Sequence, residues 1–258
     1  MLVKAKLANA HGENMATFVV AHGAWSAGFV WKKMHPLLAA QGHKLFTPSH
    51  TGLGERVHLA NPEITLDTHI EDIVSVIFHE DLHDVFLIGH SYGGLVATGV
   101  ADRIPERLKA VIYLDAFAPA NGDTMLDLAT PESKARWLEG AEKTGEGWRV
   151  PSNPLPPDTS PEDVAWITPR RHAQPLKTMT TPLKLSKGET QLPRAFIYCT
   201  RIGPGDMFGP FARNAKADKR WRYFEMDASH SPHVTAPDAL AAILDRLGRE
   251  LGEPGDTK

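Results

Sequence analysis

A five-residue sequence, Gly-His-Ser-Tyr-Gly at residues 89–93, lies between two segments of different character. Residues 84–88 before it form an apolar run that predicts a buried strand, and residues 92–103 after it show the pattern of a helix. A G-x-S-x-G sequence in this context places its serine on a tight strand-to-helix turn. A serine hydroxyl is a poor nucleophile unless a base takes its proton and donors stabilise the oxyanion. We therefore predict that Ser91 is a nucleophile and that the rest of the chain supplies these partners.

The predicted base is His230. It follows the last apolar strand, residues 221–226, and precedes a C-terminal helical pattern at residues 236–251. Where a strand, a G-x-S-x-G turn and a helix occur together, the partners follow the serine in the order acid, then histidine. His233 lies three residues further along the same loop and is the competing candidate.

The acid that orients this histidine is predicted to be Asp206. It follows the strand at residues 195–200, with room for one helix and one strand before His230. Asp115 is the alternative, because it comes directly after the strand at residues 110–114. Asp227 lies too close to His230 in sequence to be preferred.

Two backbone N–H groups are predicted to form the oxyanion site. One belongs to Tyr92, the residue after the nucleophile. The other belongs to Ala24, within the His-Gly-Ala-Trp sequence at residues 22–25 that follows the first apolar strand, residues 16–21. Gly23 is the adjacent alternative. The helix that starts after Ser91 adds the positive end of its dipole.

The alternation of strands and helices predicts an α/β fold with a mostly parallel sheet covered by helices on both faces. Helices are also expected at residues 30–41 and 66–78, and a short strand at residues 44–47. Residues 119–192 interrupt the alternation with many prolines and three tryptophans, and we expect a small helical cap there, a disordered linker being the alternative. The predicted core comprises residues 15–118 and 193–258, preceded by a flexible leader, residues 1–14.

Composition excludes some classes of partner. The formal net charge of −3 and the absence of a basic stripe argue against nucleic acid, and no run approaches the roughly 20 apolar residues that a membrane helix needs. Cys199 is the single cysteine, so no intrachain disulfide can form, and we expect a buried thiol and a cytoplasmic protein. His22, His90 and His230 lie on separate loops without ligand spacing, so we expect no metal.

The motifs together resemble one branch of the α/β-hydrolases, which includes plant methylesterases, hydroxynitrile lyases and related bacterial carboxylesterases. The resemblance runs from about residue 15 to 251 and rests on residues 22–25, 51–56, 89–94 and 206–208. It implies an α/β-hydrolase fold with a small cap, a Ser-Asp-His triad, no cofactor, and an apolar pocket for small esters.

Two departures favour ester hydrolysis within that branch. Hydroxynitrile lyases that resemble this chain carry a lysine after the histidine and a threonine in the first-strand loop, whereas this chain has Ser231 and Gly23. Without a cation, developing cyanide would be poorly stabilised. The alternatives are a hydroxynitrile lyase-like or other non-hydrolytic enzyme, cofactor-free oxygenation, and a slow-turnover small-molecule receptor.

The substrate is expected to be a small apolar or aromatic ester. Trp25, Trp137 and Trp166 are predicted to line its pocket, the alternative being that the tryptophans of the insertion fill the core of the cap. Resemblance to the carboxylesterases suggests aryl or bulky hydrophobic esters, pyrethroid-like compounds among them. An exposed apolar face of the cap would allow a homodimer.

Overall fold

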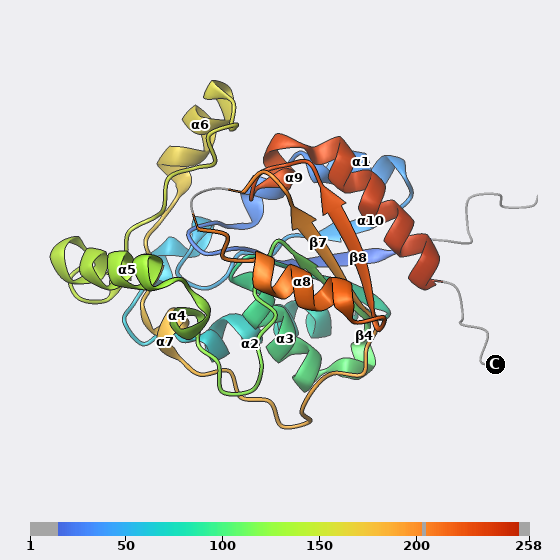
Figure 1. Ribbon diagram of the computed structural model, residues 1–258, viewed down its shortest axis with the longest axis horizontal. Coiled ribbons are helices and arrows are strands. Elements are labelled where there is room, and N and C mark those ends of the chain that lie inside the picture. Colours follow the sequence, from blue (N-terminus) through green and yellow to red (C-terminus); the bar gives the residue numbers. More distant parts are fainter. Residues whose placement is uncertain (1–14, 203–204, 253–258) are drawn as a thin grey trace, which may run out of the picture.

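The computed structural model describes residues 15–202 and 205–252, so the predicted leader, residues 1–14, lies outside the described residues. A six-stranded parallel sheet with the order β2-β1-β3-β4-β7-β8 forms the centre (Figure 1). The predicted α/β architecture, a mostly parallel sheet covered by helices on both faces, is confirmed. The strands of the sheet are β1 (Thr17–Ala21), β2 (Lys44–Phe46), β3 (Val85–His90), β4 (Leu108–Leu114), β7 (Arg194–Cys199) and β8 (Trp221–Met226).

The helices of the core follow the strands in sequence. They are α1 (Met34–Ala40), α2 (Leu66–His79), α3 (Gly93–Arg103), α8 (Gly209–Ala217), α9 (Pro232–Thr235) and α10 (Pro237–Gly252), with the 3-10 helices η1 (Gly28–Trp31), η2 (Gly54–Leu59) and η3 (Pro105–Arg107). The single helix predicted at residues 30–41 is two elements, η1 and α1. Pro36 lacks an amide hydrogen and cannot donate to the carbonyl of Lys32, which favours a break before α1.

The two faces of the sheet carry separate apolar clusters because side chains alternate along each strand. On one face Leu87 of β3 packs in a cluster with residues of α2, α3 and α8; on the other Ile88 packs in a cluster with residues of α1 and α10. Every residue of β3 is buried, as expected for a strand in the middle of a parallel sheet covered on both faces. Figure 1 shows α1 and α10 on one side of the strands and α2, α3 and α8 on the other.

All strands of the sheet run parallel, so their carboxyl ends meet at one edge. His90 at the end of β3 pairs with Leu114 at the end of β4, and Leu114 pairs with Ile197 of β7. The loops after these strands therefore lie side by side, which is where open α/β sheets bind ligands.

Residues 119–192 contribute no strand to this sheet. They form α4 (Met125–Leu128), α5 (Pro131–Thr144), α6 (Pro161–Ile167), η4 (Thr168–Arg170) and α7 (Lys177–Thr180), and a two-stranded antiparallel sheet of β5 (Arg149–Val150) and β6 (Gln174–Pro175). Local sequence starts these helices: Thr130 and Ser160 cap α5 and α6 through their side chains, each followed by a proline at the first helical position. In Figure 1, α5 and α6 project beyond the edge of the sheet.

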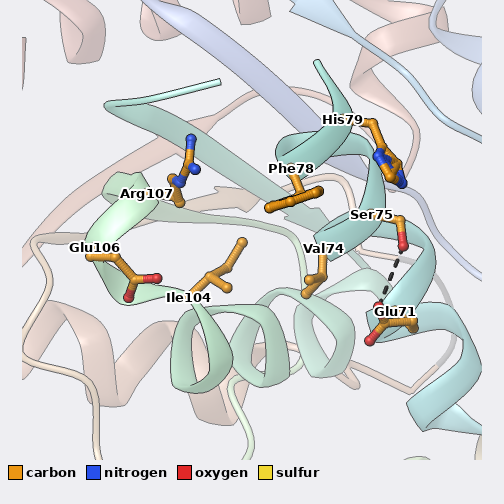
Figure 2. A pocket seen from close by; sticks show the side chains of 8 residues that line it. All are labelled: Glu71, Val74, Ser75, Phe78, His79, Ile104, Glu106 and Arg107. Carbon is orange, nitrogen blue, oxygen red and sulfur yellow. Dashed lines mark hydrogen bonds between the residues drawn. The ribbon is translucent and has the colours of Figure 1, made fainter. Parts of the chain in front are cut away.

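A surface groove of about 500 Å³ lies at the opposite end of the sheet, between the end of α2 and the segment before β4. Its residues include Phe78 of α2, together with Ile104 and Arg107 before β4 (Figure 2). Because β4 starts here and carries Asp115 at its other end, the groove is remote from Ser91. Among the described residues, no helix combines the length and the apolar character needed to cross a bilayer.

Candidate active site

Ser91 lies in the turn between β3 and α3 with a φ of 56°, a left-handed conformation that is uncommon for a residue with a side chain. The turn is tight because glycines surround it: a Cβ on Gly93 would lie 2.0 Å from the carbonyl oxygen of Ala21, and one on Gly94 would lie 2.0 Å from that of Phe117. The predicted strand-to-helix turn is therefore present, and it forces Ser91 into a strained conformation of the kind that concentrates at functional sites.

Backbone hydrogen bonds fix Ser91 against the next strand. Its N–H donates to the carbonyl of Leu114 at 3.3 Å, and its carbonyl accepts from the N–H groups of Phe117 (3.3 Å) and Gly94 (3.1 Å). The Ser91 side chain faces the same cavity as His230. No hydrogen bond joins the Ser91 hydroxyl to His230 among the described residues, and such contacts often tighten only when substrate binds.

The carboxylate beside His230 is that of Asp115, which corrects the prediction of Asp206. The Nδ1 atom of His230 lies 2.7 Å from Oδ2 of Asp115. The other oxygen of Asp115 accepts from the backbone N–H of Cys199 at 3.2 Å, and its side chain is almost fully buried. Because a carboxylate only accepts, Nδ1 of His230 carries the proton and Nε2 is left as the basic nitrogen.

Asp206 has other partners, which is the physical reason for the correction. Its Oδ1 accepts from the N–H of Gly209, the first residue of α8, at 2.7 Å, and its Oδ2 accepts from the Tyr198 hydroxyl at 3.0 Å. The Asp206 side chain lines the cavity, but among the described residues no hydrogen bond or ion pair joins its carboxylate to His230. Phe208, two residues on, stacks on the His230 ring with centroids 4.9 Å apart.

Two further histidines hold the loop of His230. The Nε2–H of His90 donates to the carbonyl of His230 at 2.7 Å, since a carbonyl can only accept. His233, the competing base, is fully buried and stacks on Trp31 at 4.4 Å. Burial lowers the pKa of His233 to about 3, and burial likewise holds the pKa of His90 well below its usual value. Both imidazoles are therefore neutral near pH 7.

The backbone N–H groups of Ala24 and Tyr92 donate no hydrogen bond to any other described residue. His22 holds the loop that contains Ala24. Its Nδ1–H donates to the carbonyl of Gly23 at 2.9 Å and its Nε2 accepts from the N–H of His50 at 3.0 Å, an arrangement that requires a neutral ring. Burial lowers the pKa of His22 to about 3, in agreement with this assignment.

A cavity of about 770 Å³ opens next to Ser91, within the usual size range of small-molecule sites. Trp25 and Trp137 line it, as predicted, with ring centroids 5.5 Å apart. Trp166 does not line it, contrary to the prediction, because its ring packs edge-on against Phe29 at 5.4 Å. Other apolar side chains in the wall are Val30, Phe117, Met125, Leu155, Ile167, Met207, Phe208 and Val234.

Cys199 is buried at the end of β7 and lines the same cavity. Burial raises the pKa of its thiol, so the sulfur is protonated at neutral pH and cannot compete with Ser91 as a nucleophile. No cluster of metal-ligating side chains occurs in the part of the chain that the structure describes.

Comparison with known proteins places the chain in a family. A model described as the alpha/beta hydrolase family matches residues 18–243. The chain belongs to the α/β-hydrolase family. The carbendazim hydrolyzing esterase of Nocardioides sp. is 35% identical over 243 residues, which cover 91% of this α/β-hydrolase and 100% of that protein.

Two other relatives show the breadth of the branch. An α-hydroxynitrile lyase of Arabidopsis thaliana is 27% identical over 103 residues, 40% of each chain. A solved extracellular α/β-hydrolase from a Paenibacillus species, described as sharing structural and functional homology with tobacco salicylic acid binding protein 2, has a TM-score of 0.78 and 26% identity over 91% of this chain and 99% of that one. The relatives named as esterases and hydrolases support ester hydrolysis as the chemistry of this α/β-hydrolase.

Proposed function

We propose that this α/β-hydrolase is a serine carboxylesterase that cleaves small apolar or aromatic esters through an acyl-enzyme. The observation that carries the proposal is the 2.7 Å contact between Asp115 and His230, both of which line the same cavity as Ser91. A nucleophile in a strained turn and an oriented base at one cavity, with unpaired N–H groups at Ala24 and at Tyr92 next to the serine, are what acyl transfer requires.

In the first step, Nε2 of His230 takes the proton of Ser91 as the serine oxygen attacks the ester carbonyl carbon. The oxyanion of the tetrahedral intermediate accepts hydrogen bonds from the N–H groups of Ala24 and Tyr92. His230 then gives its proton to the leaving alcohol as the bond between the carbonyl carbon and the alcohol oxygen breaks. Asp115 keeps the Nδ1–H tautomer and stabilises the transient imidazolium.

In the second step, water replaces the alcohol. His230 takes a proton from the water, whose oxygen attacks the acyl carbon, and it returns that proton to Ser91 as the acid leaves. The buried neutral rings of His90 and His233 hold the loop without adding a charge beside His230. They contribute position rather than proton transfer in this scheme.

The walls of the cavity support an apolar or aromatic substrate. Trp25, Trp137 and Phe117 are aromatic residues of its lining, and burial of an aryl group against such side chains favours binding. Because a relative is named for carbendazim hydrolysis, carbendazim belongs in the first substrate screen together with aryl and pyrethroid-like esters.

The test is a rapid-mixing experiment with p-nitrophenyl acetate, an ester with a chromogenic leaving group. The proposal expects a burst of p-nitrophenolate, stoichiometric with enzyme, when deacylation is slower than acylation, and mass spectrometry of the quenched enzyme should find the acetyl group on Ser91. Ser91→Ala should lower kcat by several orders of magnitude. Undiminished turnover by that variant would overturn the proposal.

Hydroxynitrile lyase activity is the second candidate that the relatives raise, but no specific observation favours it here. Ser231 follows His230, so that position supplies no cation for a leaving cyanide. A receptor would bind small ligands without producing the burst. Cytoplasmic residence and a homodimer stay predictions from the sequence.

A further inference from the structure

Trp25 has an unusual backbone conformation for a large aromatic residue. It follows Ala24 in the loop after β1, and its φ is 58°, in the left-handed region. Residues other than glycine persist there only where surrounding contacts over-determine the conformation. The contacts that hold Trp25 are therefore informative about the adjacent N–H of Ala24.

All of these contacts come from the insertion, residues 119–192. The backbone N–H of Trp25 donates to Oε1 of Gln174 at 3.1 Å, and its indole N–H donates to the carbonyl of Val150 at 2.8 Å. Its carbonyl accepts a longer bond from Nε of Arg171 at 3.4 Å, and its ring packs against Trp137. The insertion therefore contacts the N–H, the carbonyl and the side chain of one residue.

Two of these partners lie opposite each other in one small sheet. Val150 of β5 pairs directly with Gln174 of β6, so the two-stranded sheet presents both acceptors to Trp25 at once. The pair is more than a hundred residues from Trp25 in sequence.

The amide of Gln174 has one orientation only. Its Nε2 donates to the Thr178 hydroxyl at 2.7 Å, and that hydroxyl donates its own proton to the carbonyl of Pro175 at 2.7 Å. The Thr178 oxygen can therefore only accept from Gln174, which leaves Oε1 facing the N–H of Trp25. Gln174 is fully buried, so both halves of the amide are satisfied and a flipped amide would leave buried groups unpaired.

These bonds fix the peptide units on both sides of Ala24. The carbonyl of Gly23, which shares a peptide unit with the Ala24 N–H, accepts from Nδ1–H of His22 at 2.9 Å. The Trp25 N–H, in the next peptide unit, donates to Oε1 of Gln174. Since the carbonyl and N–H of one peptide unit point in opposite directions, the His22 bond turns the Ala24 N–H away from His22, and the bond to Gln174 stops the loop from rotating out of this position.

We propose that Gln174 is a positioning residue for the oxyanion hole: through the Trp25 N–H it holds the Ala24 N–H where the substrate oxyanion forms. The inference rests on the proposed esterase function. It makes the insertion part of the catalytic apparatus as well as a wall of the pocket. It also predicts that loss of the Gln174 acceptor weakens transition-state binding more than substrate binding.

The test compares Gln174→Met, which keeps the length of the side chain and removes the acceptor, with Gln174→Glu, which keeps an acceptor oxygen. With p-nitrophenyl acetate, Gln174→Met should lower kcat about tenfold or more and change KM by less than about twofold, because a displaced oxyanion donor acts in the transition state. Gln174→Glu should recover part of the lost kcat, because burial favours the protonated carboxyl, whose O–H can donate to Thr178 while the other oxygen accepts from Trp25.

The second readout is an aryl trifluoromethyl ketone. Ser91 adds to its carbonyl carbon, the serine proton passes to His230, and the ketone oxygen becomes an oxyanion. Its inhibition constant should rise in parallel with the fall in kcat for Gln174→Met, whereas affinity for the product acid should not change. Equal losses for ketone, product and substrate would assign Gln174 a structural role and overturn the inference.

Circular dichroism and thermal midpoints establish that the variants fold. Should Gln174→Met fail to fold, Thr178→Val carries the test, because it removes the acceptor that orients the amide; it should show the same kcat and ketone pattern with a smaller magnitude. If wild-type turnover depends on Ser91 and yet the variant that folds keeps full kcat and ketone affinity, this inference is wrong while the esterase proposal stands.

Discussion

The loops after β4 and β7 each carry an aspartate at the carboxyl edge of the sheet, and the two aspartates have different environments. Asp115 after β4 has a side chain that is 7% exposed and contacts the N–H of Cys199 and the imidazole of His230. Asp206 after β7 is 31% exposed and contacts Gly209 and Tyr198, both within eight residues of it. The first aspartate bonds to a residue distant in sequence, and the second to the strand and helix that flank its own loop.

An aspartate that follows a strand of the sheet is therefore not, by that position alone, the partner of the histidine. A carboxylate that can bind the first N–H of the following helix is stabilised locally, and this competes with a distant partner. Asp115 has a φ of 41° and is followed by no helix, so its side chain turns into the protein toward His230.

The largest effect is expected from a substitution that breaks the contact between Asp115 and His230. Asp115→Asn should lower kcat for p-nitrophenyl acetate by roughly 10³–10⁴-fold, because an amide can donate to Nδ1 and so favours the wrong tautomer of His230. Steady-state kinetics check this. A loss below tenfold, in a variant whose thermal midpoint is unchanged, would contradict the assignment of Asp115.

The next-largest effect concerns two buried neutral histidines, His22 and His233. The pKa of His22 and that of His233 are lowered to about 3, whereas an unfolded chain binds these protons near pH 6.5. Between pH 6.5 and 3 the unfolded state therefore holds more protons, so the stabilisation is complete above pH 6.5 and is lost as pH falls through this window. Each such histidine should contribute a slope of about 1.4 kcal/mol per pH unit.

The variant His233→Phe tests the predicted pH dependence of stability. The variant keeps a ring against Trp31 and removes one titrating group, so the slope of unfolding free energy against pH between 4 and 6 should become shallower by about 1.4 kcal/mol per unit. Urea denaturation at several pH values measures it. An unchanged slope would mean that His233 is not held neutral in the folded protein.

A smaller effect is expected at Asp206, with two variants that separate its possible roles. Asp206→Ala removes the acceptor for the N–H of Gly209 and should cost about 1 kcal/mol of stability. Asp206→Asn keeps an acceptor oxygen there, so it should be close to wild type in stability and within about threefold in kcat. A fall in kcat for Asp206→Asn as large as that of Asp115→Asn would restore Asp206 as the acid.

The smallest effect is expected at the hydroxyl that holds Asp206. Burial, with the hydrogen bond to Asp206, raises the pKa of Tyr198 to about 12, so the phenol is a donor at neutral pH. Tyr198→Phe should cost about 0.5 kcal/mol, because the partly exposed carboxylate of Asp206 can exchange this bond for water. Thermal denaturation measures this loss of stability, and steady-state kinetics on the same variant measure kcat. A loss of kcat above tenfold would show that the Tyr198 hydroxyl takes part in catalysis.

The sequence by itself determined the local parts of this α/β-hydrolase. The apolar strand, the glycines around Ser91 and the following helix are contiguous in the chain, so their pattern predicts the strained turn directly. The position of His230, in a loop between the last strand and the C-terminal helix, follows from the same alternation of elements. Each of these features is a property of neighbouring residues.

Only the tertiary structure decided between Asp115 and Asp206, because β4 and β7 are neighbours in the sheet and both loops come near His230. It alone also brought Gln174 to Trp25 and left Trp166 outside the cavity, since no periodicity encodes a contact across 149 residues. The physical reason is the same in each case. A side chain's partner is set by competition among all donors and acceptors within reach, and that set exists only after the chain has folded.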